Sequence, residues 1–199
     1  SSDNFLNKRF LLIQPEAIRI ITEDALNKIS HFYRSSHLKL LKKILDDNEA
    51  SQNDHFVALT MLKNANISAS GVLPMCQDTG TAIINGYRGK NIFTDFNEEK
   101  ELSRGIYNSY QNNNLRFSQL APISMFEEKN TNNNLPGEIN LYSAESEEYK
   151  FTFIQKGGGS ANKSFLYQQT KAILNPKDLR KFLYEIIISL GTAACPPYH

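Results

Sequence analysis

Four consecutive side chains near the middle of the chain carry a thiol, an amide, a carboxylate and a hydroxyl, in the run Cys76-Gln77-Asp78-Thr79. Pro74 biases the residue before it toward extended backbone, so we expect an arch here and not a helix. Gly80 lets the chain turn or approach a ligand closely, because it has no Cβ. Taken alone, the same run is also compatible with a polar turn beside one buried cysteine. Residues 72–81, called the arch below, are therefore a candidate site that other parts of the sequence must support.

A run of three glycines forms a second candidate site, in Lys156-Gly157-Gly158-Gly159-Ser160-Ala161-Asn162-Lys163. Consecutive glycines after a strand can present backbone N–H groups to an anion. A nucleotide-binding P-loop needs Gly directly before Lys, and here that position is Asn162. A small carboxylate between two lysines is a better match for these donors, and a tight turn with solvated lysines is the alternative.

The second of two cysteines lies in the terminal run Gly191-Thr192-Ala193-Ala194-Cys195-Pro196-Pro197-Tyr198-His199. Two cysteines are too few for the disulfide framework of a small secreted protein. In a reducing compartment each is available as a core residue, a nucleophile or a metal ligand. Because the chain stops inside this cysteine-containing run, we expect a fragment of a longer protein.

Length and charge restrict the class of protein. A chain of 199 residues suits one large domain or two small ones, and we expect a single domain over residues 1–199. The 22 basic and 21 acidic residues are interspersed and give a net charge of +1, so neither nucleic acid nor an acidic membrane surface is an expected partner. No apolar run approaches the roughly 20 residues of a membrane span.

Three amphipathic helices are predicted ahead of the arch. The first begins at Pro15, and the other two cover residues 38–45 and 52–63, with Ser51 as the N-cap of the third. We expect their apolar stripes to face the core: Ile18, Ile21, Ala25, Ile29 and Phe32 in the first, Leu38, Leu41, Ile44 and Leu45 in the second, and Phe56, Leu59 and Leu62 in the third.

Strands are predicted after the arch. Residues 81–84 form a short apolar strand that should end in a turn at Asn85-Gly86, and residues 98–110 form a helix. Residues 138–142 and 149–155 are two strand-like runs joined by acidic turn residues, which predicts a hairpin. A last helix follows Asn175 as N-cap, with Pro176 at its first position. The sequence therefore predicts an α+β fold, with N-terminal helices leading into a small mixed or antiparallel sheet packed with helices.

Together, the arch, the glycine run and the terminal run resemble class I fumarate hydratase, the iron–sulfur type of fumarase. The segments Asn114-Leu115-Arg116-Phe117-Ser118-Gln119 and Asn134-Leu135-Pro136 resemble the same family. The resemblance covers nearly the whole chain from the first helix onward. It implies the N-terminal, cluster-binding domain of a hydro-lyase that interconverts fumarate and L-malate, a reaction of the tricarboxylic acid cycle. L-tartrate dehydratases share much of the pattern, so an alpha-type domain of such an enzyme is the alternative.

The resemblance also implies a cofactor and roles for site residues. It implies a [4Fe–4S] cluster held by three cysteine thiolates, with the cluster-binding loops at one edge of the sheet and one iron free to act as a Lewis acid. Cys76 and Cys195 match two of the ligand positions, and the family's third cysteine lies beyond His199. Gln77, Arg116 and Gly159 resemble contacts to the substrate carboxylates. Asp78 resembles a substrate contact that is also the catalytic acid/base group.

The resemblance further implies how the complete protein is organised. In the family a C-terminal domain supplies more substrate contacts, so we expect residues 1–199 alone to be inactive. A homodimer is expected of the complete protein. An exposed iron is vulnerable to oxidants, so the expected location is a reducing interior, the mitochondrial matrix or the cytoplasm.

Overall fold

A computed structural model describes residues 2–5, 8–158 and 164–190 of this chain. The chain divides into two compact units, the first over residues 1–156 and the second over residues 157–199. Each unit is described by itself.

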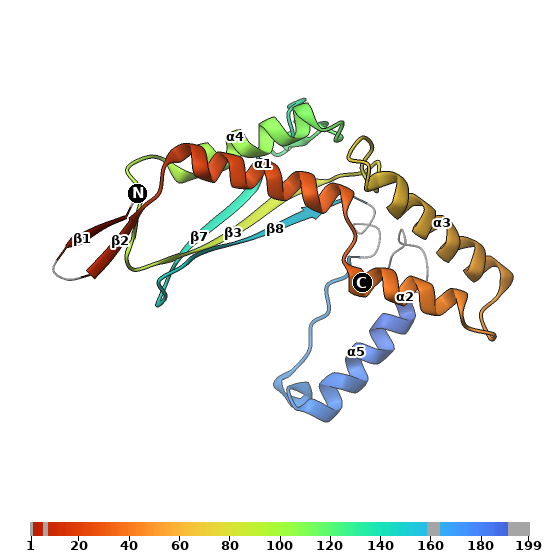
Figure 1. Ribbon diagram of the computed structural model, residues 1–199. Helices are drawn as coiled ribbons and strands as arrows, with labels where there is room; N and C mark the ends of the chain where they lie inside the picture. The colour runs from red at the N-terminus through yellow and green to blue at the C-terminus, as the bar shows by residue number, and fades with distance from the viewer. Residues whose placement is uncertain (1, 6–7, 159–163, 191–199) are drawn as a thin grey trace. The chain divides into compact units, whose positions relative to one another are not determined.

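A three-stranded mixed sheet lies at the centre of the first unit (Figure 1). Its strand order is β7 (Glu138–Ala144), β3 (Thr81–Gly89) and β8 (Tyr149–Lys156), and β3 pairs parallel with β7 and antiparallel with β8. The predicted α+β class is confirmed. The predicted hairpin is wrong, because β3 lies between the two strands that were expected to pair. The connection after β7 passes over the end of β3, where the N–H groups of Gly89 and Lys90 donate to carbonyls of the connecting turn.

The predicted turn at Asn85-Gly86 is also wrong, since β3 runs straight through both residues. A Cβ at position 86 would lie 2.7 Å from Leu141 Cδ2 and 2.9 Å from Phe151 Cε1, on the two neighbouring strands. The glycine therefore reflects close side-chain packing across the sheet and not a turn, and any larger residue would require those two side chains to shift.

Helices α1 (Pro15–His31) and α4 (Glu98–Asn112) lie side by side over one face of this sheet (Figure 1). The row of α1 that is buried is Ile18, Thr22, Leu26 and Ser30. The predicted stripe was therefore only partly correct, because Ile21 and Ile29 are 49% and 37% exposed. The core between the helices and the sheet consists of Ile18, Leu26, Ala82, Ile84, Leu102, Ile106, Tyr110 and Leu115.

Helices α2 (Ser35–Leu45) and α3 (Gln52–Ser68) follow α1 and pack against each other. The predicted N-cap is confirmed: Ser51 accepts from the N–H of Asp54, and Asp54 accepts from the N–H of Ser51, which forms a capping box. The predicted apolar stripe of α3 is wrong, because Phe56 and Leu59 are exposed and the buried apolar residue of that helix is Ala58.

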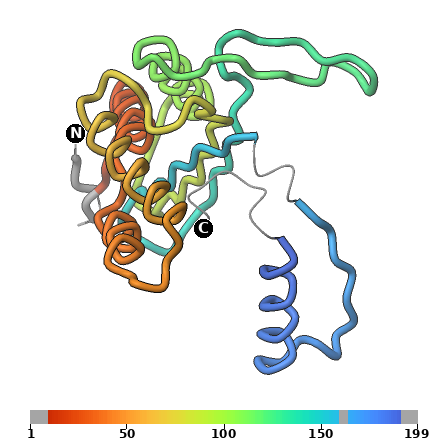
Figure 2. The backbone as a smooth tube through the Cα atoms, turned by 90° about the vertical axis from the view of Figure 1, so that its right-hand side faces the viewer, coloured from red at the N-terminus to blue at the C-terminus, as the bar shows by residue number. Residues whose placement is uncertain are grey.

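Smaller elements complete the first unit. Strands β1 (Ser2–Phe5), β2 (Lys8–Leu12) and β4 (Ile92–Phe93) form a second sheet. Strands β5 (Leu120–Pro122) and β6 (Glu128–Asn130) form a narrow hairpin, drawn in blue-green, that reaches away from the helices and the central sheet (Figure 2). The apolar side chains at its tip, Met125 and Phe126, are 88% and 91% exposed.

The second unit contains a 3₁₀ turn η2 (Lys171–Ile173) and helix α5 (Pro176–Leu190). The predicted cap is confirmed, because Asn175 Oδ1 accepts from the N–H of Asp178 and Pro176 is the first helical residue. None of the helices in the described parts of either unit is long and apolar enough to cross a bilayer.

Candidate active site

The N-terminal side of the arch is fixed at Met75, directly before the cysteine. Its N–H donates to Ser30 O near the end of α1 at 2.9 Å, and its carbonyl accepts from Asn64 Nδ2 on α3 at 2.7 Å. Ser30 is buried, so the first of these hydrogen bonds is shielded from water. Two helices thus hold the backbone that presents Cys76.

The C-terminal side of the arch is joined to the segment that carries Arg116. Thr79 Oγ1 accepts from the N–H of Arg116 at 3.0 Å and donates to the carbonyl of the same residue at 3.3 Å. Thr79 is 6% exposed, and the neighbouring Leu115 is buried in the core. This reciprocal pair brings together two stretches that lie 37 residues apart in the sequence.

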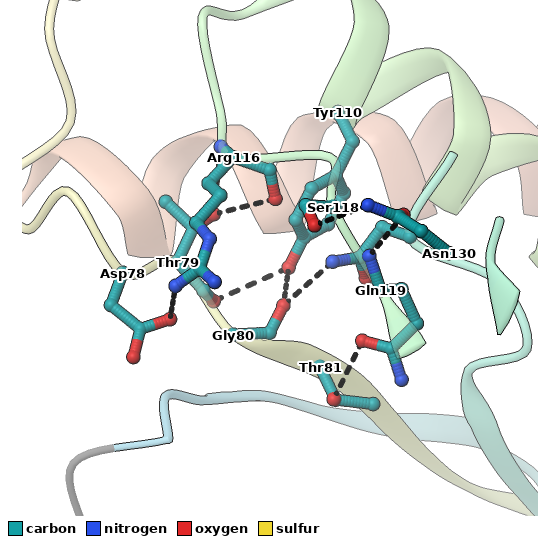
Figure 3. A network of polar contacts seen from close by, with 10 residues as sticks. Asp78, Thr79, Gly80, Thr81, Tyr110, Arg116, Ser118, Gln119 and Asn130 are labelled. Atoms are coloured by element: carbon teal, nitrogen blue, oxygen red, sulfur yellow. Dashed lines mark hydrogen bonds and ion pairs between the residues drawn. The ribbon is translucent and has the colours of Figure 1, made fainter. Parts of the chain in front are cut away.

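Three of the predicted site residues present their side chains at the surface of the arch. Cys76 is a free and exposed thiol, and Gln77 is exposed. Asp78 Oδ1 forms an ion pair with Arg116 Nη1 at 3.2 Å, and the two side chains point toward each other (Figure 3). The site therefore combines a thiol, an amide, a carboxylate and a guanidinium, which suits recognition of an anionic substrate and transfer of a proton.

The end of the arch is held by two buried side chains that converge on Gly80 O. Tyr110 Oη, from α4, lies 2.9 Å from this oxygen and 3.3 Å from Thr79 O, and Asn134 Nδ2 donates to Gly80 O at 2.8 Å. Gly80 has φ +67°, in agreement with the turn that the sequence predicts. Burial raises the pKa of the Tyr110 hydroxyl far above its ordinary value, and the charge of Asp78 adds to this while a hydrogen bond from Gln155 opposes it. Tyr110 therefore remains a protonated donor at neutral pH.

A second set of contacts ties the base of the β5–β6 hairpin to the start of β3. Thr81 Oγ1 donates to Gln119 Oε1 at 3.0 Å, and Asn130 Oδ1 accepts from the N–H of Gln119 at 3.2 Å (Figure 3). Asn130 Nδ2 also donates to Ser118 Oγ at 2.8 Å. The segment that carries Arg116 is therefore bonded to the arch side at both of its ends.

The glycine run starts beside the arch, because Lys156 is the register partner of Thr81 in the pairing of β8 with β3. Two of the predicted site residues, Gly159 and Cys195, lie outside the described residues. Within the described ranges, no three His, Cys, Asp or Glu side chains are close enough together to hold a metal ion. By its donor type and exposure, the thiol of Cys76 could serve as one ligand of an iron–sulfur cluster.

Several residues that shape this site carried no sequence signal strong enough to select them. Tyr110 appears in the sequence as the end of a helix, and Gln155 as the end of a strand. Asn134 lies in a motif that resembles the family, but its role follows from geometry: its φ of +57° is one that Asn tolerates, and its N–H donates to Phe117 O at 2.7 Å. In the sequence, the clue to Asn134 was its place in the run Asn134-Leu135-Pro136.

Comparison with known proteins gives a family match over residues 20–199, to the family model described as Fumarate hydratase (Fumerase). The chain is 57% identical over 189 residues to "Fumarate hydratase 1, mitochondrial" of Leishmania major, a match that covers 95% of this chain and 34% of that relative. It is 50% identical over 199 residues to "Fumarate hydratase class I, aerobic" of Escherichia coli strain K12, covering 100% of this chain and 36% of the relative. This chain thus spans about a third of the length of these relatives.

A more distant similarity concerns the alternative substrate. The chain is 27% identical over 191 residues to a "Putative L(+)-tartrate dehydratase subunit alpha" of Methanocaldococcus jannaschii, covering 92% of this chain and 60% of the relative.

Proposed function

We propose, because this chain belongs to the fumarate hydratase (Fumerase) family, that the complete protein containing it is a hydro-lyase that reversibly hydrates fumarate to L-malate. The observation that carries the proposal within the chain is the Asp78–Arg116 pair, held at 3.2 Å beside the exposed thiol of Cys76. A carboxylate and a guanidinium at one surface are the groups that a dicarboxylate substrate and a proton transfer require.

Substrate binding is assigned to Arg116, Gln77 and Gly159. The guanidinium of Arg116 is half exposed, so it can fork onto a carboxylate of the substrate with a geometry that lysine cannot reproduce. The exposed amide of Gln77 adds a donor for a carboxylate oxygen. Gly159 is assigned as a backbone donor by its place in the glycine run, which begins next to Thr81.

Asp78 is assigned as the acid/base group. In the direction of hydration, a water molecule gives a proton to a carboxylate within hydrogen-bond reach as its oxygen bonds to one alkene carbon, and the alkene electron pair takes up a proton at the other carbon from a second group of the complete protein. In the reverse direction that second group removes the proton from carbon, and the carboxyl group returns its proton to the departing hydroxyl. Arg116, paired with Asp78 at 3.2 Å, keeps the carboxylate oriented toward the substrate position.

The cofactor assigned to the complete protein is a [4Fe–4S] cluster, with Cys76 and Cys195 as two of its three thiolate ligands. Cys76 fits because its thiol is free, exposed and fixed by two helices through Met75. When bound, such a cluster supplies a Lewis-acidic iron with an open coordination position. We assign the 199 residues to one N-terminal domain that is inactive alone, since this chain holds two cysteines.

The test is fumarate hydration by the anaerobically reconstituted complete protein and its Cys76→Ala variant. We expect the parent to be active and the Cys76→Ala variant to lose more than about a hundredfold of that activity, because the variant lacks a direct ligand of the cluster. Val72→Ala is the matched control, since this arch residue is 59% exposed and has no polar side chain. Full activity in Cys76→Ala would refute the proposed cluster role.

The second candidate, L-tartrate dehydration, is favoured only by the 27% relative. Comparing kcat/KM for fumarate, L-malate and L-tartrate on the same preparation separates the two. We expect the fumarate value to exceed the L-tartrate value; the opposite order would replace the proposed substrate.

Assembly and location are proposed from the family alone. We assign a homodimer to the complete protein, and the mitochondrial matrix or the cytoplasm as its location. One relative is named as mitochondrial. Sedimentation of the complete protein and fractionation of the source cells test these two assignments.

A further inference from the structure

A chain of partly buried hydrogen bonds connects the two sides of the arch. Ser30 Oγ on α1 donates to Gln155 Oε1 on β8 at 2.8 Å, and Gln155 Nε2 donates to Tyr110 Oη at 3.3 Å. Tyr110 in turn donates to Gly80 O at 2.9 Å. The backbone carbonyl of Ser30 accepts from the N–H of Met75, so the chain starts and ends on the arch itself.

Two of the three side chains in this chain of bonds, Ser30 and Tyr110, are well shielded from water, and Gln155 between them is half-buried. Ser30 is 3% exposed and Tyr110 is 1% exposed, and the ring of Tyr110 belongs to the hydrophobic core. Hydrogen bonds in such surroundings are stronger than at the surface and costly to leave unmade. The residues between Met75 and Gly80 are therefore spanned by a closed loop of bonds that runs through three elements, α1, β8 and α4.

The loop of bonds encloses four residues, Cys76 to Thr79. The proposed function assigns metal binding, substrate binding and proton transfer to the first three of them. The hydrogen bonds of Tyr110 go to the carbonyls of Thr79 and Gly80 and to Gln155, and the side chain of Gln155 bonds Ser30 and Tyr110. These bonds act on the site through the backbone of the arch.

We infer that Tyr110 and Gln155 are positioning residues that fix the arch relative to the end of strand β8. Gln155 is the neighbour of Lys156, the last residue of β8, so its bond to Tyr110 links the end of that strand to the carbonyl that closes the arch. This inference deepens the proposed function and depends on it for its catalytic consequence, while its structural part can be tested on this chain alone.

The structural test is amide hydrogen exchange in the 199-residue chain with Tyr110→Phe. This variant keeps the ring in the core and removes the hydroxyl. We expect exchange of the Met75 and Arg116 amides to quicken by about three- to tenfold, the factor for one net hydrogen bond. Both amides report on the arch, because they donate to Ser30 O and Thr79 Oγ1.

Tyr149→Phe is the matched control. Tyr149, on β8 of the central sheet, is a partly buried tyrosine that packs against the same core as Tyr110, and its hydroxyl donates to Glu98 Oε1 at 2.7 Å. It pairs with Arg88 at the end of β3 opposite to Thr81. We expect Tyr149→Phe to leave exchange at Met75 and Arg116 unchanged. An equal rise in both variants, or no rise in Tyr110→Phe, would overturn the inference.

The catalytic test uses the complete reconstituted protein. Because a small displacement of reacting groups can cost up to about a hundredfold in rate, we expect Tyr110→Phe to lower kcat by about ten- to a hundredfold, with KM changed by less than about threefold. Gln155→Met should act in the same direction, and Tyr149→Phe should leave both constants unchanged. A parent protein that is inactive on fumarate would refute the proposed function, and the exchange data would still decide whether Tyr110 positions the arch.

Discussion

At the scale of single residues, the Asp78–Arg116 ion pair contributes little to stability, and the role proposed for it is in substrate binding and proton transfer. The side chain of Arg116 is 51% exposed and that of Asp78 is 21% exposed, so water screens their attraction. Exposed pairs of this kind contribute about 0–1 kcal/mol to stability. The backbone bonds between Thr79 and Arg116 hold the two segments together, which leaves the guanidinium available to a substrate carboxylate.

Arg116→Lys tests whether the guanidinium binds a substrate carboxylate. In the complete protein we expect KM for fumarate to rise about tenfold or more, because an ammonium group cannot form the planar fork onto a carboxylate. In the 199-residue chain the free energy of unfolding should change by less than about 0.5 kcal/mol. Arg104→Lys is the control, since Arg104 is 58% exposed and pairs with Glu101 on α4. An equal KM effect in both variants, or none in Arg116→Lys, would argue against substrate binding by Arg116.

At the scale of elements, the site depends on how closely α4 packs on α1, because α4 carries Tyr110 and α1 carries Ser30. Gly105 of α4 lies directly against α1, since a Cβ there would lie 2.5 Å from Thr22 Cβ and 2.8 Å from Arg19 O. One of these neighbours is backbone and cannot rotate away. The crossing therefore requires glycine, despite the lower helix propensity of that residue.

Gly105→Ala is accordingly predicted to destabilise the 199-residue chain by about 1–3 kcal/mol through overpacking, measured by urea unfolding. On propensity alone, the same change in an exposed helix would stabilise by up to about 1 kcal/mol. Lys100→Ala, at an exposed position of the same helix, should stay within about 0.5 kcal/mol of the parent. A neutral or stabilising effect of Gly105→Ala would show that the two helices can separate without cost.

The same elements show how far the sequence could predict the fold. Local signals were sufficient where the structure is set locally, as for the Ser51 and Asn175 caps. They failed where distant contacts decide: β3 inserts between β7 and β8, and Gly86 serves packing across three strands. For the site, motifs identified Asp78 and Arg116, which the structure pairs. Tyr110 and Gln155 could not be found in this way, because no motif contains them and their roles depend on hydrogen bonds that form only in the folded chain.

At the scale of the whole molecule, the proposed active site is larger than this chain. The chain spans 34% and 36% of the two fumarate hydratases compared above, and its sequence contains two cysteines for a cluster that needs three thiolates. Family membership is shown for this part, whereas turnover is a property proposed for the complete protein. Iron and sulfide content distinguishes this chain from the complete protein more directly than activity does.

The amount of iron and sulfide bound should therefore differ between the complete protein and this chain. After anaerobic reconstitution, we expect the complete protein to bind a full cluster, seen as equal iron and sulfide contents and as broad visible absorption. The 199-residue chain should bind far less, because a cluster short of one thiolate exchanges its iron with solvent and chelators. A 199-residue chain with both Cys76 and Cys195 replaced by alanine gives the baseline for non-specific iron. A stable cluster in the parent chain would mean that the two thiols suffice with another ligand from residues 1–199. No cluster in either form would reduce the arch to a carboxylate-binding surface and leave Cys76 and Cys195 as incidental thiols.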